Sequence, residues 1–104
     1  GATPRRMKLV RRGRLAPEAK LDLHGLTREE ARFRTRHFLE NSAYHGLKIV
    51  LIITGRGKGS GGEPVLRGEL ERYLSQEGRA WVGEWGRAPR QYGGEGALVV
   101  FLKG

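Results

Sequence analysis

Two side chains that could exchange a proton stand close together near the start of the chain, in the stretch LDLHG at residues 21–25. Side chains alternate between the two faces of a strand, so Asp22 and His24 would share one face, opposite the two leucines. A carboxylate beside an imidazole fixes the tautomer of the ring and produces an acid or base near neutral pH. The alternative is structural, with Asp22 bonded to backbone N–H groups and His24 a satisfied histidine before a glycine turn.

A second candidate for chemistry is the segment GRGKGSGG at residues 55–62. Its five glycines allow backbone N–H groups to turn toward a phosphate, and Arg56 and Lys58 add positive charge. The register of a nucleotide P-loop does not fit, and the match to GxGxxG over residues 57–62 is a weak signal in a glycine-rich tract. The segment therefore predicts phosphate binding, with a flexible connector as the alternative.

The composition excludes several other kinds of site. The 104 residues include no cysteine, so a disulfide scaffold, a zinc–thiolate site and a cysteine nucleophile are all excluded. No Gly-x-Ser-x-Gly elbow is present. A metal site with three protein ligands is not evident, although Asp22 could hold Mg²⁺ or Mn²⁺ together with a substrate phosphate. After these exclusions, the candidate functions that remain are phosphate-ester chemistry and phosphate binding.

Four strands are expected to carry these residues. The apolar run KIVLIIT at residues 48–54 is typical of a strand buried on both faces. Shorter patterns predict further strands at residues 20–24, 80–85 and 97–102. Because helical patterns separate the first three strands, the order β-α-β-α-β-β predicts an α/β layered fold with a mostly parallel sheet.

Two helices are expected between the strands. The first begins at Thr27, which forms a capping box with Glu30, and it stops at Gly46. The second follows Pro64 and ends at Gly78.

The topology is expected to bring both candidate motifs to one edge of the sheet. Strands 20–24 and 48–54 are joined by a helical crossover, so they should run parallel and side by side. Ligands in open α/β sheets bind at the carboxyl ends of such strands. The stretch around Asp22 and His24 and the stretch that begins at Thr54 should therefore share one crevice.

Positive charge is concentrated at the start of the chain. Residues 1–20 hold seven Lys and Arg against one Glu, a net of +6, and the remaining thirteen against ten give +3, which together make +9. We therefore expect a basic flexible arm at residues 1–19, ahead of a domain at residues 20–104. Such an arm contacts nucleic acid or is a solvated linker. Arg87 and Arg90 are further candidates for nucleic-acid contacts.

The apolar segments and the start of the sequence predict where the protein is located. No run is long enough to span a bilayer and no signal peptide is visible, so a cytoplasmic protein without a membrane partner is expected. We also expect a monomer.

Taken in order, the motifs resemble the Smr domain, the small MutS-related module, in its stand-alone proteobacterial form. The matching stretches are LDLHG at 21–25, LIITGRG at 51–57, Leu66-Arg67, and GGEGALVV at 93–100. The resemblance implies a two-layer β-α-β-α-β-β sandwich with a four-stranded mixed sheet, similar to the C-terminal domain of a bacterial translation initiation factor.

The resemblance also implies nucleic-acid binding and endonuclease activity, as DNA nicking or RNA cleavage, in some members on stalled ribosomes. It assigns functional positions to Asp22 and His24 and, in the TGxG motif, to Thr54, Gly55 and Gly57. Many members have His where this chain has Thr54, so His24 would act without a second histidine. The choice between DNA and RNA and the need for a metal stay open. A non-catalytic module that binds nucleic acid or the ribosome is the alternative function.

Overall fold

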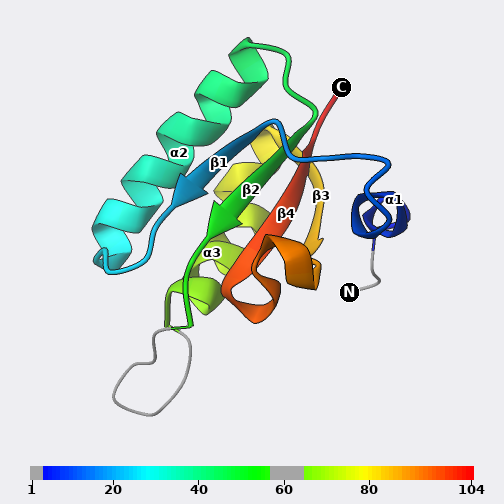
Figure 1. Cartoon of the computed structure of the whole chain (residues 1–104). Helices are drawn as coiled ribbons and strands as arrows, with labels where there is room; N and C mark the ends of the chain where they lie inside the picture. Colours follow the sequence, from blue (N-terminus) through cyan, green and yellow to red (C-terminus); the bar gives the residue numbers. More distant parts are fainter. Residues whose placement is uncertain (1–3, 57–64) are drawn as a thin grey trace.

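The computed structural model describes residues 4–56 and 65–104 (Figure 1). Its four strands form one sheet in the order β1-β2-β4-β3. The strands are β1 (Ala19–Asp22), β2 (Ile49–Ile53), β3 (Val82–Arg87) and β4 (Ala97–Leu102). The α-helices of the described residues are α1 (Met7–Arg11), α2 (Arg28–Tyr44) and α3 (Val65–Ser75), and the short 3₁₀ helices are η1 (Glu77–Ala80), η2 (Arg90–Tyr92) and η3 (Gly94–Gly96). No helix in this part of the chain is both long and apolar enough to cross a membrane.

The sheet is mixed rather than mostly parallel. The neighbours β1 and β2 run parallel, whereas β4 is antiparallel to both β2 and β3. The parallel pair is the one that the helical crossover of α2 predicts. The expectation of a mostly parallel sheet is wrong because β4 returns from β3 through a short connection without a crossover helix, which favours antiparallel pairing. The α/β class and the mixed four-stranded sheet are confirmed, while the likeness to a translation initiation factor stays a prediction.

The start of α2 has the local structure that its sequence predicts. The Thr27 hydroxyl accepts from the Glu30 N–H at 3.1 Å, and the Glu30 carboxylate accepts from the Thr27 N–H at 2.9 Å. This capping box satisfies two N–H groups that would otherwise lack partners. At the other end, the chain leaves the helix through Gly46, whose φ of 72° suits glycine.

Sequence reasoning placed the third strand too early and the end of the second helix too late. α3 ends at Ser75, and η1 follows, so β3 begins at Val82 rather than at residue 80. Gly78 is buried within η1, where an added Cβ would lie 3.1 Å from the Tyr73 carbonyl oxygen. Glycine therefore allows the two backbone segments to approach closely there. Pro64 lies outside the described residues.

One face of the sheet packs against α2 and α3. The buried residues of this core come from all four strands and both helices, and they include Leu23, Leu39, Ile52, Leu74, Leu98 and Val100. Glu69 of α3 accepts from Arg32 of α2 at 2.9 Å, which adds a polar link between the two helices. Figure 1 shows these two helices on the same side of the sheet.

The opposite face packs against α1. Met7 and Val10 are 1% and 0% exposed and belong to a second core with Val99 and Phe101 of β4. The flexible arm that the charge of residues 1–19 predicts is therefore not what the structure shows for residues 4–19. Two apolar side chains three positions apart form one face of a helical turn, and the basic residues lie around it. Burying that face covers a part of the sheet that would otherwise be open to water.

We expect Met7→Ala to lower the free energy of unfolding by about 2–4 kcal/mol, because it leaves a cavity against the sheet. Urea denaturation measures this change. Leu9→Ala is the matched control, since Leu9 lies in the same helix but is 39% exposed. The control should cost less than about 0.5 kcal/mol. Equal, small effects of the two substitutions would contradict the packing of α1.

Candidate active site

The acidic and imidazole side chains lie at the end of an edge strand. β1 pairs only with β2, and the Leu23 N–H continues that pairing by donating to the Ile53 carbonyl at 2.7 Å. Leu21 and Leu23 are buried against the helices, which leaves Asp22 and His24 in solvent, with 49% and 72% of their side chains exposed. The alternation predicted for the LDLHG stretch is therefore confirmed. Its polar face is solvated because β1 stands at the edge of the sheet.

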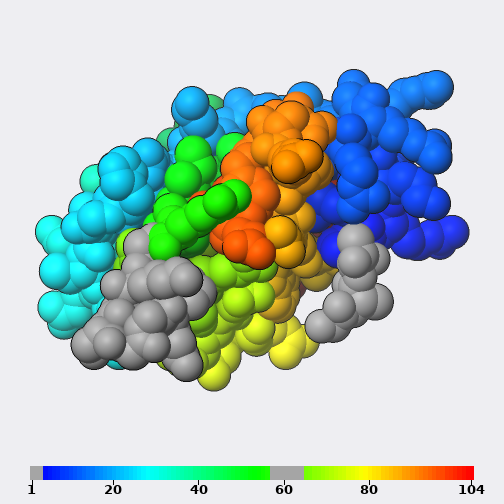
Figure 2. Space-filling model, turned by 60° about the horizontal axis from the view of Figure 1, so that its bottom comes forward, coloured from blue at the N-terminus to red at the C-terminus, as the bar shows by residue number. Residues whose placement is uncertain are grey.

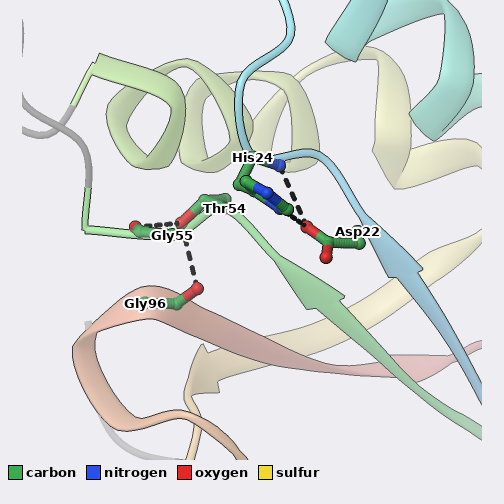
Figure 3. Close-up of polar contacts among 5 residues, drawn as sticks. All are labelled: Asp22, His24, Thr54, Gly55 and Gly96. Carbon is green, nitrogen blue, oxygen red and sulfur yellow. Dashed lines mark hydrogen bonds and ion pairs between the residues drawn. The ribbon is translucent and has the colours of Figure 1, made fainter.

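The side chains of Asp22 and His24 are hydrogen-bonded to each other (Figure 3). Asp22 Oδ1 lies 2.6 Å from His24 Nδ1 and also accepts from the His24 backbone N–H at 3.0 Å. These two hydrogen bonds hold the pKa of the Asp22 carboxyl below its ordinary value, and the bond with the imidazole ring has the larger effect. The ionised carboxylate can only accept, so Nδ1 is the donor in this bond and Nε2 is left to face other groups. The pair is thus arranged as an oriented acid or base.

The end of β2 is fastened to the start of β4 through one carbonyl group. The Gly96 carbonyl accepts from the backbone N–H groups of Thr54 at 2.8 Å and Gly55 at 3.0 Å. The Thr54 hydroxyl lies 3.3 Å from the same oxygen and 3.2 Å from the Gly55 carbonyl (Figure 3). Thr54 is 3% exposed, so its hydroxyl is directed at backbone oxygens and stabilises the turn.

Arg67 and Gly96 support this turn, and neither was singled out for a role by sequence reasoning. The Arg67 guanidinium donates to the Glu95 carbonyl at 2.7 Å, which ties α3 to the turn before β4. A Cβ at Gly96 would lie 3.4 Å from both the Gly55 carbonyl carbon and Arg56 Cγ. Both residues belong to stretches that carry the family resemblance, which is the signal that could have found them. Their contacts join segments far apart in the sequence.

His24 lines a groove with the residues that follow β2. This first groove, of about 570 Å³, is lined by Gly25, Thr54, Gly55 and Arg56 and by the first residues of α2 and α3. The structure therefore brings together His24 and the TGxG start, as the topology predicts. Asp22 does not line the groove but holds the histidine that does.

The remaining candidate residues lie elsewhere. Gly57 and Lys58 fall outside the described residues. Arg87 and Arg90 line a second groove, to which Arg56 also contributes. This groove and the first one lie on opposite sides of the turn at residues 93–96. Arg87 is paired there with Glu95 at 3.3 Å.

A metal at Asp22 would depend on ligands from outside the protein. Within residues 4–56 and 65–104, no three His, Asp or Glu side chains gather into a metal site. A single carboxylate can hold Mg²⁺ when water and substrate phosphate supply the other oxygens.

Comparison with known proteins gives a consistent result. The sequence model of the Smr domain matches residues 21–103. Among solved structures, the Smr domain of Thermus thermophilus MutS2 is 31% identical with a TM-score of 0.72, covering 83% of this chain and 99% of that one. YdaL, a stand-alone small MutS-related protein from Escherichia coli, is 28% identical with a TM-score of 0.78, covering 100% of this chain and 79% of that one.

Two curated relatives have names that describe a role. Ribosome rescue factor SmrB of Haemophilus influenzae is 34% identical over 96 residues, which are 92% of this chain and 53% of that protein. Endonuclease MutS2 of Streptococcus mutans is 36% identical over 100 residues, which are 95% of this chain and 12% of that protein. The chain thus spans about half the length of the first relative and a small part of the second.

We expect His24→Ala to raise the pKa of Asp22 toward its ordinary value, because the substitution removes the larger of the two bonds that stabilise the carboxylate. Carbon-detected NMR titration of the Asp22 carboxyl measures the shift. In the wild type the pair stabilises the fold above the unfolded-state pKa of Asp22, and this contribution is lost as the pH falls through the lower folded-state pKa. His37→Ala is the control and should leave the pKa of Asp22 unchanged, since His37 lies within α2. An equal Asp22 pKa in wild type and His24→Ala would show that the pair does not form.

Proposed function

The chain belongs to the Smr domain family, and from this premise we propose that it is an endonuclease that cuts nucleic-acid phosphodiesters, with ribosome-bound RNA as its substrate. The observation that carries the proposal is the bonded Asp22–His24 pair, whose ring lines the same groove as Gly55 and Arg56. An acid or base and a phosphate-binding cation in one groove are what phosphodiester cleavage needs.

The names of the relatives support both parts of the proposal. The MutS2 relative is named an endonuclease, which supports cleavage. The SmrB relatives are named ribosome rescue factors, which supports RNA at the ribosome as the substrate. Because ribosomes work in the cytoplasm, this substrate would place the protein there.

On RNA, His24 would act as the general base. Nε2 would take the proton of the 2′-hydroxyl, whose oxygen attacks the adjacent phosphorus. The bond from phosphorus to the 5′-oxygen breaks, and that oxygen leaves with a proton from water. The products are a 2′,3′-cyclic phosphate and a 5′-hydroxyl. Asp22 would keep Nδ1–H in place and stabilise the imidazolium that forms.

Phosphate binding in the described part of the loop would depend on Arg56. The N–H groups of Thr54 and Gly55 already donate to the Gly96 carbonyl, so they are not available to a phosphate. The Arg56 guanidinium follows directly after them and lines the groove. A guanidinium can form two parallel bonds to phosphate oxygens and stabilise the charge that develops as the phosphorane forms.

DNA would require a different first step, because it has no 2′-hydroxyl and water must attack. Asp22 is the residue that would hold Mg²⁺ or Mn²⁺, and the ion would supply an activated water at neutral pH. The protein itself would contribute the Asp22 carboxylate and the His24 side chain that this carboxylate orients.

We expect His24→Ala to lower the rate of cleavage of single-stranded RNA by about 10²–10⁴-fold, which is the usual contribution of a general base. Gel analysis of an end-labelled strand measures the rate. His45→Ala is the control, since His45 bonds to the Asn41 carbonyl at the far end of α2 and should not affect cleavage. Unchanged cleavage by His24→Ala would exclude this role. Tight RNA binding by a wild type that shows no cleavage, either in EDTA or with any added metal, would favour the non-catalytic module.

We expect cleavage of RNA to persist in EDTA and to leave 2′,3′-cyclic phosphate ends, because the 2′-hydroxyl supplies the nucleophile. End-group analysis of the products by mass spectrometry measures this. A matched strand with 2′-deoxyribose at the cleaved position is the control and should resist cleavage under the same conditions. Products with 3′-hydroxyl ends, or activity that returns only with Mg²⁺, would contradict the metal-free route.

A further inference from the structure

A second groove lies on the other side of the turn at residues 93–96 from His24. It has a volume of about 1300 Å³, and its lining includes Arg11 of α1, Arg87 and Arg90, as well as Arg56. In Figure 2 the end of β2 in green, the turn before β4 in red-orange, the segment 87–92 in orange and α1 in blue follow one another across a single face of the molecule. α1 thus lies on the same face as the end of β2.

Arg56 connects the two grooves. It lines both of them, and its side chain passes over the turn at residues 93–96. A Cβ at Gly94 would lie 3.7 Å from Arg56 Nη2, and one at Gly96 would lie 3.4 Å from Arg56 Cγ. Both glycines are thus close neighbours of the Arg56 side chain. A phosphate bound at Arg56 would be at the junction of both grooves.

The position of α1 beside the second groove is fixed by contacts on several sides. The Gln91 side-chain amide donates to the Arg11 carbonyl at 2.9 Å, which ties the end of α1 to η2. Met7 anchors the helix in the second core, and the Arg6 guanidinium lies 4.5 Å from the centre of the Phe101 ring. The backbone that carries Arg11 is thus held beside η2, in which Arg90 lies. A cation on a fixed helix binds with less loss of conformational entropy than one on a mobile arm.

The charges of the second groove favour an anionic ligand. The three carboxylates in its lining each have an arginine within reach, in the pairs Arg6–Glu84, Arg67–Glu71 and Arg87–Glu95. Among the described residues, no carboxylate forms an ion pair with Arg11, Arg56 or Arg90. These three guanidinium groups are available for phosphates, which they can bind in bidentate geometry.

We propose that the second groove binds the phosphate backbone of the nucleic-acid strand that continues from the candidate active site, and that Arg11 and Arg90 are its main contacts. The inference rests on the proposed function, since it supplies the path of the same substrate. We assign a single strand, because Trp85, which packs in part against the core under α2 and α3, also lines the groove. The exposed part of its indole ring offers a surface on which unpaired bases stack.

The test compares the wild type with Arg11→Ala/Arg90→Ala on single-stranded RNAs of about 4 and about 12 nucleotides, both within the range that one single-strand binding domain covers. Only the longer RNA would extend from Arg56 along the second groove. Fluorescence anisotropy measures binding in a His24→Ala background, so that no cleavage occurs. Removing two phosphate contacts should reduce the slope of log affinity against log salt by about 1.4 for the long strand. We expect affinity for the long strand to fall about tenfold and affinity for the short strand to stay within about twofold.

The matched control is Arg34→Ala/Arg79→Ala, which makes the same change of net charge with two exposed arginines outside both grooves. It should bind the long strand like the wild type. Arg11 and Arg90 are themselves exposed, so the thermal unfolding midpoint should stay within a few degrees of the wild type. Arg11→Lys/Arg90→Lys keeps both charges but loses the bidentate geometry, so it should recover only part of the lost affinity.

Three results would overturn the second groove as a strand-binding path. The first is wild-type binding of the long strand by Arg11→Ala/Arg90→Ala, and the second is an equal loss with the Arg34/Arg79 control. The third is a loss of affinity for a duplex RNA of the same length without any loss for the single strand, which would contradict the assignment of a single strand as the ligand. None of these depends on cleavage. A failure of the proposed function would instead appear as full cleavage by His24→Ala, so the two failures can be told apart.

Discussion

The burial of both faces of β2 and β4 is the constraint from which the rest of the structure follows. Every residue of β4 is buried, and so are four of the five residues of β2. A sheet centre of this kind gains stability only if both of its faces are covered. α2 and α3 cover one face, and the other face is covered by α1 and the turns beside β3. The segment at the start of the chain is thus part of the fold that presents the site.

The same constraint limits where polar chemistry can lie. Apolar side chains fill the centre of the sheet, so charged groups are confined to its edge strands and to the ends of its central strands. Asp22 is on the edge strand β1, and Thr54 directly follows the central strand β2. The Gly96 carbonyl joins the end of β2 to the start of β4 and thereby fixes the direction in which the chain leaves toward Arg56. The candidate active site is therefore built from strand ends held rigidly by the core.

Much of this arrangement could be predicted because its causes are local. The capping box of Thr27 and Glu30, the parallel pairing across the α2 crossover and the bounds of β4 each depend on a short pattern. The alternation of the LDLHG stretch likewise predicted which side chains would be exposed. The insertion of β4 between β2 and β3 could not be predicted from such patterns, because it depends on pairings between distant segments. The roles of Gly96 and Arg67 were missed for the same reason.

The packing of residues 4–19 was missed for a different reason. In residues 1–20 seven Lys and Arg outnumber the apolar anchors, so composition alone favours a flexible segment. Met7 and Val10 are nevertheless spaced to fall on one helical face, and the second face of the sheet needs a cover. Once that face is buried, the basic residues between and after the anchors must point outward. A linker would need no such anchors, and a nucleic-acid-binding arm would need no fixed position. A segment with both features suits the proposed strand path, because the backbone that carries Arg11 has a fixed position beside η2.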